Sequence, residues 1–160
     1  MATEKLKFKL ELYATTWDKL PHAEILLNDK SYFKDDITGT EDNPDIIEFE
    51  HECTEGETAT LTVNHSGKVP GQTVVNDKGD ILKDQLLHIK SIEIDEIELG
   101  ALVYEGVYTP QYPEPWATQQ REAGTELQKS FKNVTSMGHN GKWQLKFESP
   151  FYMWLLENLY

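Results

Sequence analysis

The stretch IIEFEHECTEGETATLTVNH (residues 46–65) decides the fold class that the sequence predicts. Its second half alternates apolar and polar side chains at Ala59, Leu61 and Val63, and a short segment around Gly56 separates it from the first half. Alternation with a period of two indicates a strand with one buried face, and a short glycine-containing connection between two such runs indicates a β-hairpin. We therefore predict a hairpin over these residues.

Further strand-like segments lie on both sides of this hairpin. Residues 5–13 (KLKFKLELY) and 141–149 (GKWQLKFES) alternate in the same way, residues 23–29 (AEILLND) are an apolar run that ends at an Asn-Asp turn, and the polar residues 31–44 predict a loop. Six to eight short strands separated by turns are typical of an antiparallel β-sandwich or jelly roll. We predict an all-β fold of this kind, in which residues 1–160 form a single domain.

The segment LLHIKSIEIDEIEL (residues 86–99) changes the side on which its apolar residues fall. They are odd-numbered at Leu87 and Ile89, then even-numbered at Ile92 and Ile94, and then odd-numbered again. A strand cannot exchange its two faces without an irregularity. We predict a β-bulge near Lys90 and Ser91 and a second bulge or bend near Asp95 and Glu96.

The segment YEGVYTPQYPEPW (residues 104–116) contains three prolines, at positions 110, 113 and 115. Proline lacks a backbone N–H and disrupts both helices and sheet interiors, so we predict neither a central strand nor a regular helix here. Residues 117–130 can carry a helical turn.

The final segment, SPFYMWLLENLY (residues 149–160), predicts a short C-terminal helix, because Ser149 suits an N-cap and Pro150 suits the first helical position. Its aromatic side chains are Phe151, Tyr152, Trp154 and Tyr160. So much apolar surface is unfavourable in water, and we expect the helix to dock on the domain or on a partner protein.

The charge of the chain argues against one class of partner. The 28 acidic and 15 basic residues give a formal net charge of −13, which has the wrong sign for binding a phosphate backbone. We therefore expect no nucleic-acid partner.

No apolar run approaches the roughly 20 residues of a membrane span, and the first residues lack the apolar core of a signal peptide, so we expect synthesis without a cleaved leader.

A lone cysteine, Cys53, lies among Glu52, Glu55 and Glu57. A single cysteine cannot form an intramolecular disulfide, and neighbouring negative charges raise the pKa of a thiol. We expect Cys53 to be chemically inert.

The stretch GQTVVNDKGDILKDQ (residues 71–85) is rich in oxygen donors, namely Asn76, Asp77, Asp80 and Asp84. Carboxylate and amide oxygens are the ligands that Ca²⁺ prefers. The spacing does not fit an EF-hand, because Lys78 precedes Gly79. The same residues are also typical of an ordinary turn between two strands, and the sequence leaves both interpretations open.

Residues 61–99, LTVNHSGKVPGQTVVNDKGDILKDQLLHIKSIEIDEIEL, resemble the core of small calcium-dependent carbohydrate-binding modules of the xylan-binding type. In that family a strand ends in an Asn-Asp pair, a loop follows, and an Asp-led segment opens the next strand. The resemblance implies a Ca²⁺ cofactor and a polysaccharide ligand. It places Asn64 at the end of the first strand and Asp84 at the opening of the next, and together with the loop acids Asp77 and Asp80 these residues are our candidate metal ligands. His65 stands where the family carries an aspartate, and a neutral imidazole is a poor calcium ligand.

Together with residues 103–120 (VYEGVYTPQYPEPWATQQ) and 141–160, the same segment also resembles small β-sandwich structural proteins of tailed, T4-like marine bacteriophages. This second resemblance implies a virion component, such as a head decoration, tail or fibre-associated protein. It also implies virion subunits as partners, an oligomer or multi-copy assembly, and synthesis in the host cytoplasm before incorporation into the virion.

Four aromatic residues, Tyr104, Tyr108, Tyr112 and Trp116, recur at intervals of four in the proline-rich segment. Flat aromatic faces stack on sugar rings, but the same rings can also hold a long loop against the sandwich or contact a neighbouring subunit. Our candidate ligand-binding or partner-binding residues are Tyr108, Tyr112, Trp116 and Trp154.

Catalysis has the weakest support in the sequence. No Ser-His-Asp signature, phosphate-binding glycine-rich loop or HExxH motif is present, and no pair among the 28 acids is marked by its context. His51 and His65 approach each other only across the predicted hairpin. We therefore predict a non-enzymatic virion structural protein that acts through protein contacts; the alternative is a carbohydrate-binding module, calcium-dependent if the loop acids bind metal.

Overall fold

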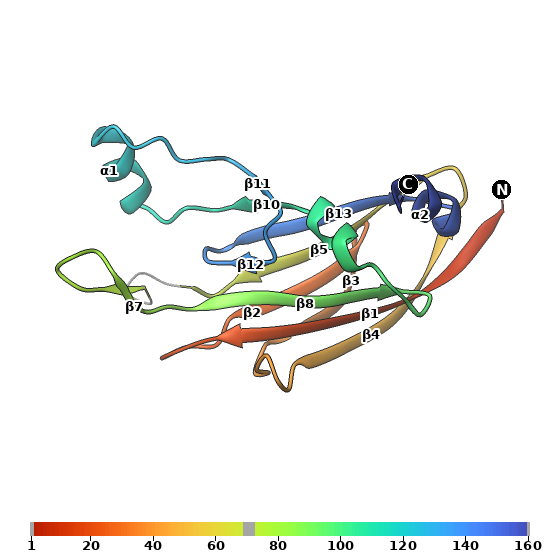
Figure 1. Ribbon diagram of the computed structural model, residues 1–160, viewed down its shortest axis with the longest axis horizontal. Helices are drawn as coiled ribbons and strands as arrows, with labels where there is room; N and C mark the ends of the chain where they lie inside the picture. The colour runs from red at the N-terminus through yellow and green to blue at the C-terminus, as the bar shows by residue number, and fades with distance from the viewer. Residues whose placement is uncertain (1, 69–72, 160) are drawn as a thin grey trace.

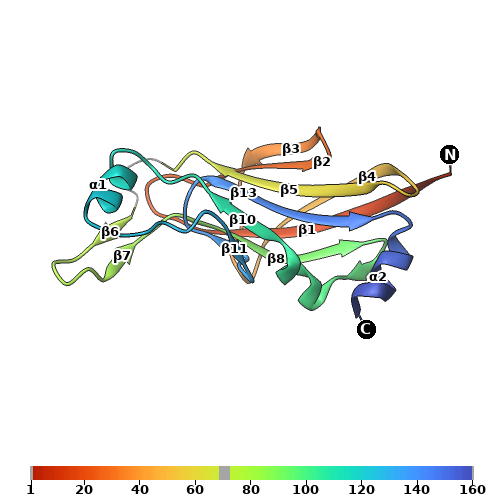
Figure 2. The same cartoon turned by 90° about the horizontal axis from the view of Figure 1, so that it is seen from above.

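The alternating segments form two antiparallel sheets that face each other in the computed structural model, which describes residues 2–68 and 73–159 (Figures 1 and 2). The strands of the first sheet are, in order, β12 (Ser136–Met137), β8 (Leu86–Ile94), β1 (Thr3–Thr15) and β4 (Asp45–Thr54), with β9 (Ile97–Glu98) paired to β8. The second contains β11 (Phe131–Lys132), β10 (Val107–Pro110), β13 (Gly141–Glu148), β5 (Thr58–Ser66), β2 (His22–Leu27) and β3 (Lys30–Asp36). The predicted all-β sandwich with a short C-terminal helix is confirmed.

The remaining elements are small. A separate two-stranded hairpin is formed by β6 (Val74–Val75) and β7 (Ile81–Lys83). The helices are the 3₁₀ helix η1 (Gly100–Glu105), α1 (Trp116–Glu122) and α2 (Phe151–Leu159). No helix within the described residues is long and apolar enough to cross a membrane.

The core lies between the two sheets because each strand buries alternate side chains. Strand β1 buries Leu6, Phe8, Leu10 and Leu12, and β13 buries Trp143, Leu145 and Phe147. The rings of Phe8 and Phe147 meet across the sandwich with their centroids 6.1 Å apart. Each fully buried side chain of this size contributes roughly 1.5–3 kcal/mol by leaving water, so these facing rows dominate the stability of the fold.

The hairpin predicted for residues 46–65 is wrong in its pairing. Strand β4 pairs with β1, whereas β5 pairs with β13 and β2, so the chain passes from one sheet to the other at residues 55–57. Gly56 makes this change of direction with φ +90°, and its N–H donates to the carbonyl of Ser149 at 2.8 Å. Alternation shows that a strand has one buried face, but it does not show which sheet the strand belongs to. The side chains of Ile47 and Leu61 are buried in the same core, although their strands lie in opposite sheets.

The predicted loop over residues 31–44 is also partly wrong, because residues 30–36 form β3 and pair with β2. The polar composition hid this strand, although its Tyr32 and Phe33 both pack against the core. Tyr32 stacks on Phe49 of the opposite sheet with ring centroids 4.4 Å apart, and its hydroxyl lies 2.6 Å from His51 Nδ1. His51 therefore lies at this edge of the sandwich and does not meet His65 across a hairpin.

Both predicted irregularities in residues 86–99 are confirmed. The pairing of β1 with β8 shifts register between Glu11 and Leu12, which leaves Lys90 as the extra residue. Asp95 and Glu96 have φ of 51° and 66° and form the tight turn that joins β8 to β9. These two features keep apolar side chains directed into the core on both sides of each irregularity.

The proline-rich segment contains a strand that the sequence argued against. Residues 107–110 form β10, which lies between β11 and β13. The strand is compatible with its proline because Pro110 is its last residue, opposite Gly141, and the other two prolines follow it. The predicted helical turn begins shortly afterwards, as α1.

The C-terminal helix α2 closes the end of the sandwich opposite α1 (Figures 1 and 2). Its first turn is capped by Glu4 of β1, since Glu4 Oε2 accepts a hydrogen bond of 2.7 Å from the backbone N–H of Phe151 and another from the hydroxyl of Ser149. Phe151 and Trp154 pack on Phe147, so the predicted docking of the helix is observed for these two rings. Tyr160, also expected to dock, lies outside the described residues.

Cys53 is buried on β4 beside Glu4, its pairing partner on β1. Burial raises the pKa of its thiol to about 11, and the negative charge of Glu4 adds to this effect. The thiolate, which is the reactive form, is therefore scarce at neutral pH.

The capping of α2 by Glu4 gives a first prediction. Glu4→Gln keeps the size of the side chain but removes the charge that faces the positive end of the helix, so we expect the free energy of unfolding to fall by about 1–2 kcal/mol in urea titrations. The matched control is Glu50→Gln on β4, whose partner Lys5 and own side chain are both largely exposed, and which should change stability by less than about 0.5 kcal/mol. Equal effects of the two substitutions would contradict the capping role.

Candidate functional site

Four segments meet at the end of the sandwich that carries α1 and the β6–β7 hairpin (Figures 1 and 2). They are the residues just after β5, the residues just before β8, the turn before β13 and the segment before α1. The register of the second sheet brings two of them together, because His65 of β5 pairs with Gly141 of β13. Gly141 lies so close to β10 that an added Cβ would come within 2.4 Å of the carbonyl oxygen of Thr109.

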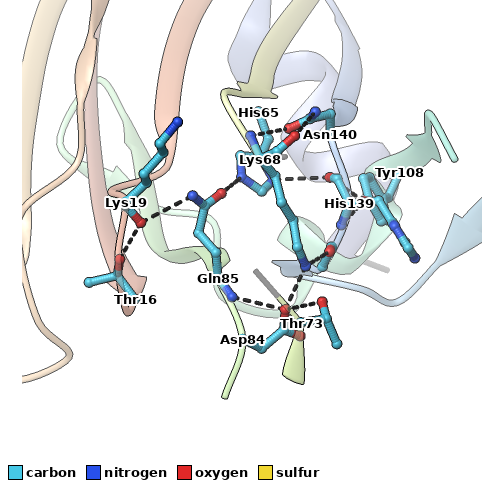
Figure 3. Close-up of polar contacts among 11 residues, drawn as sticks. Thr16, Lys19, His65, Lys68, Thr73, Asp84, Gln85, Tyr108, His139 and Asn140 are labelled. Atoms are coloured by element: carbon cyan, nitrogen blue, oxygen red, sulfur yellow. Dashed lines mark hydrogen bonds and ion pairs between the residues drawn. The ribbon is translucent and has the colours of Figure 1, made fainter. Parts of the chain in front are cut away.

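Lys68 joins three of these segments (Figure 3). Its ammonium Nζ lies 2.5 Å from Asp84 Oδ1 and also donates to the carbonyl of Gly138. Its backbone is held by Asn140, whose side chain accepts from the N–H of Lys68 at 2.9 Å and donates to its carbonyl at 2.8 Å. The side chains of Lys68 and Asp84 are only 10% and 15% exposed, so this ion pair is largely shielded from water.

Asp84 accepts two further hydrogen bonds at the same oxygen, from the hydroxyl of Thr73 at 2.6 Å and from the backbone N–H of Gln85 at 2.8 Å. Burial alone would raise the pKa of Asp84, but the hydrogen bonds from Lys68 and Thr73 and the charge of Lys68 outweigh it and hold this pKa below its ordinary value. Asp84 is therefore ionised at neutral pH.

His65 and Gln85 form a buried link beside the ion pair. His65 Nε2 lies 3.0 Å from Gln85 Oε1, and the amide nitrogen of Gln85 donates to the carbonyl of Lys19 at 3.1 Å. His65 Nδ1 lies 2.9 Å from the carbonyl oxygen of His139. Burial lowers the pKa of His65, and Lys68 lowers it further. His65 is thus a neutral structural side chain.

Three aromatic rings, Tyr112, Trp116 and His139, pack together next to the ion pair, and we call them the aromatic platform. Their ring centroids are separated by 6.0 Å (Tyr112 to Trp116), 5.1 Å (Tyr112 to His139) and 5.7 Å (Trp116 to His139). Trp116 remains 39% exposed. The hydroxyl of Tyr112 donates to the carbonyl of Gln128 at 2.5 Å, which fixes the ring from its far end.

Tyr108 supports the platform through the backbone of His139. It is buried in the core, and its hydroxyl donates to the carbonyl of His139 at 2.7 Å and accepts from the N–H of His139 at 2.9 Å (Figure 3). Burial raises the pKa of Tyr108 to about 12, so the phenol stays protonated. Burial lowers the pKa of His139, and Lys68 adds to this, so the platform presents a neutral imidazole at pH 7.

The candidate metal ligands occupy separate places in the fold. Asn64 lies within β5 opposite Lys142, and Asp77 and Asp80 lie in the turn between β6 and β7. There the side-chain oxygen of Asn76 accepts from the N–H groups of Lys78 and Asp80, both at 2.9 Å, as in an ordinary turn built on asparagine.

A divalent cation does not fit Asp84 as this end of the molecule is built, because a lysine ammonium already lies against its carboxylate and the nearby carbonyl of Gly138. Within residues 2–68 and 73–159, no group of three or more His, Cys, Asp or Glu side chains is arranged to hold a metal ion. Asn64, Asp77 and Asp80 stay predicted calcium ligands.

Of the four candidate binding residues, Tyr108, Tyr112 and Trp116 come together at the α1 end, and Trp154 lies at the opposite end on α2. No local pattern in the sequence marks Lys68, His139 or Asn140. Their role depends on contacts between segments about 70 residues apart, which a local pattern does not encode.

No protein-family model matches the chain, and no curated protein sequence matches it. Among solved structures, the chain is similar to the selenomethionine form of vCBM60, described with a circular permutation that links two families of calcium-dependent carbohydrate binding modules; the TM-score is 0.49, with 8% identity over 87% of this chain and 88% of that chain. It is also similar to vCBM60 in complex with galactobiose, with a TM-score of 0.47 and 8% identity over 86% and 95% of the two chains.

These structural neighbours are carbohydrate-binding modules, the alternative class named by the sequence resemblance. With 8% identity and TM-scores below 0.5, they identify no binding residue in this chain. Neither of them bears on the resemblance to phage virion proteins, which stays a prediction.

The ion pair of Lys68 and Asp84 gives a prediction for the pH dependence of stability. Because the pKa of Asp84 is lower in the folded chain than its unfolded value of about 4, the pair stabilises the fold fully above that pH and loses this effect as the pH falls through the folded pKa. Asp84→Asn leaves a shielded ammonium without its counter-charge, so we expect the free energy of unfolding at pH 7 to fall by about 2–4 kcal/mol.

The measurement is urea unfolding of the wild type and the variant between acidic and neutral pH, with the exposed Asp77→Asn as control. The gap between the wild type and Asp84→Asn should narrow below about pH 4. A gap that stays constant over the whole range would show that the carboxylate charge is not the source of the stabilisation.

Proposed function

We propose that the α1 end of the sandwich binds a carbohydrate without catalysis, by stacking a sugar ring on Trp116. The observation that carries this proposal is the aromatic platform, in which a partly exposed indole is held in place by Tyr112 and His139. A binding ring that is already fixed loses little conformational entropy when its ligand arrives. An apolar face beside hydrogen-bonding groups suits a sugar, which has an apolar ring face and a rim of hydroxyls.

Polar side chains lie close to Trp116 in the sequence and on the surface. Glu114 and Arg121 flank it on the segment before α1 and on α1 itself, form an exposed ion pair at 3.8 Å, and remain open to further hydrogen bonds. The net charge of −13 disfavours a polyanionic polysaccharide. We therefore propose a neutral oligosaccharide or polysaccharide as the ligand.

The test is a glycan array followed by calorimetry with neutral oligosaccharides, among them a xylo-oligosaccharide and galactobiose. Trp116→Ala should weaken binding at least about tenfold, since removal of a central aromatic contact costs more than about 1.4 kcal/mol. The matched control is Tyr104→Ala, which removes another exposed aromatic ring, on η1, that takes no part in the platform. A blank array, or equal binding by both variants and the wild type, would refute the carbohydrate proposal.

A second candidate function is contact with other protein subunits, and a specific observation favours it. Helix α2 buries Phe151 and Trp154 but leaves Tyr152, Met153 and Leu156 exposed. An exposed apolar face on a docked helix is typical of an assembly surface. We propose this face as the site at which the chain would join an assembly such as a virion, the setting that the sequence resemblance implies.

The assembly proposal is tested by light scattering of the purified protein over a range of concentrations. We expect a concentration-dependent oligomer that Leu156→Glu converts to monomer, because a charge cannot be buried unpaired in an apolar interface. The control is Glu157→Gln, which changes a neighbouring exposed position on the same helix without adding charge. A wild type that stays monomeric at all concentrations and recovers no partner from virion lysates would exclude this function.

A further inference from the structure

We infer that the ammonium group of Lys68 takes the place that a bound divalent cation would have at this end of the molecule, so that the binding site is organised without metal. The inference rests on the proposed carbohydrate function for its ligand, whereas the geometry of the lysine stands independently of any ligand.

The contacts of Lys68 Nζ are those of a hard cation. It lies between a carboxylate oxygen of Asp84, 2.5 Å away, and a backbone carbonyl oxygen of Gly138, and both are donor types that Ca²⁺ binds. Unlike a free ion, this charge is covalently tethered, and the Asn140 side chain holds the backbone of Lys68 on both its N–H and its carbonyl. The cation therefore cannot be diluted away or removed by a chelator.

Charge balance also favours the lysine over a metal. One ammonium and one carboxylate neutralise each other. A divalent cation entering the cluster would have to expel the ammonium from a largely buried position or accept its repulsion at short range. Either cost counts against metal binding at Asp84.

The same contacts make Lys68 a positioning residue for the aromatic platform. Nζ holds the carbonyl of Gly138, and the next residue is His139, whose ring touches both Tyr112 and Trp116. The hydroxyl of Tyr108 forms hydrogen bonds with both the carbonyl and the N–H of His139. The turn before β13 is thus held by Lys68 on one residue and by the buried Tyr108 on the next. These hydrogen bonds fix the position of His139 in the platform.

The first experiment titrates Ca²⁺ into the wild-type protein by calorimetry and repeats the oligosaccharide titration with and without EDTA. We expect no heat from Ca²⁺ and a Kd for the sugar that stays within about twofold in EDTA. Saturable Ca²⁺ binding that Asp84→Asn abolishes, or loss of sugar binding in EDTA, would overturn the inference.

The second experiment tests positioning by the NMR signals of the Trp116 indole and the His139 ring. Lys68→Met removes the ammonium and keeps the length of the side chain, so we expect both signals to shift and sugar affinity to fall at least about tenfold. The control is Lys78→Met, which removes a positive charge from the exposed β6–β7 turn and should leave both signals in place. Unchanged signals in Lys68→Met would overturn the positioning role.

The double variant Lys68→Met with Asp84→Asn separates positioning from stability. It leaves no unpaired charge, so its midpoint in urea should recover relative to Lys68→Met, while the Trp116 and His139 signals should stay displaced because nothing donates to Gly138. Recovery of both the midpoint and the signals would show that the lysine acts on stability alone.

The failure of the proposed function can be told apart from the failure of this inference. If the wild type binds no oligosaccharide, the carbohydrate proposal falls, and the Ca²⁺ titration and the ring signals still decide the role of Lys68. If sugar binding is found but requires Ca²⁺, the function stands and the metal-free site is refuted.

Discussion

The contact between the inner faces of the two sheets is the interaction on which the rest of the structure depends. Phe8 of β1 meets Phe147 of β13 across the sandwich, and the buried rows of both strands extend from that contact toward the two ends. Strands β5 and β13 are antiparallel neighbours in the second sheet. The residues that follow β5 and those that precede β13 are therefore brought together at the α1 end. The candidate site is therefore built from strand ends whose positions the core sets.

The sequence predicted individual strands better than it predicted their partners. Burial of one face requires alternation, and alternation revealed β1, β5 and β13 and even the bulge at Lys90. It carries no information on pairing, which is why the predicted hairpin at Gly56 is wrong: the connection joins two sheets. Strand β3 was missed because it lies at the edge of its sheet, where most of its side chains can remain polar and exposed.

The residues of the candidate site also divide into those that the sequence predicts and those that only the fold reveals. Tyr112, Trp116 and Asp84 could be named from the sequence because rings in a proline-rich segment and an acid before a strand are local signals. Lys68 and His139 were not foreseen, because their importance comes from the hydrogen bonds they make to other segments after folding. A carboxylate in a sequence predicts an affinity for positive charge, but only the fold decides whether a metal or a side chain supplies it.

The burial of Cys53 has a practical consequence for a chain with one cysteine. Because its thiol has a pKa of about 11 and lies in the core, maleimide reagents that attack exposed thiolates will leave it untouched while the protein is folded. A second cysteine introduced on an exposed position near either end would then carry a fluorophore at one defined place, without first mutating the native residue. With one cysteine introduced at each end, the same chain would carry the two labels that a distance measurement between its ends requires.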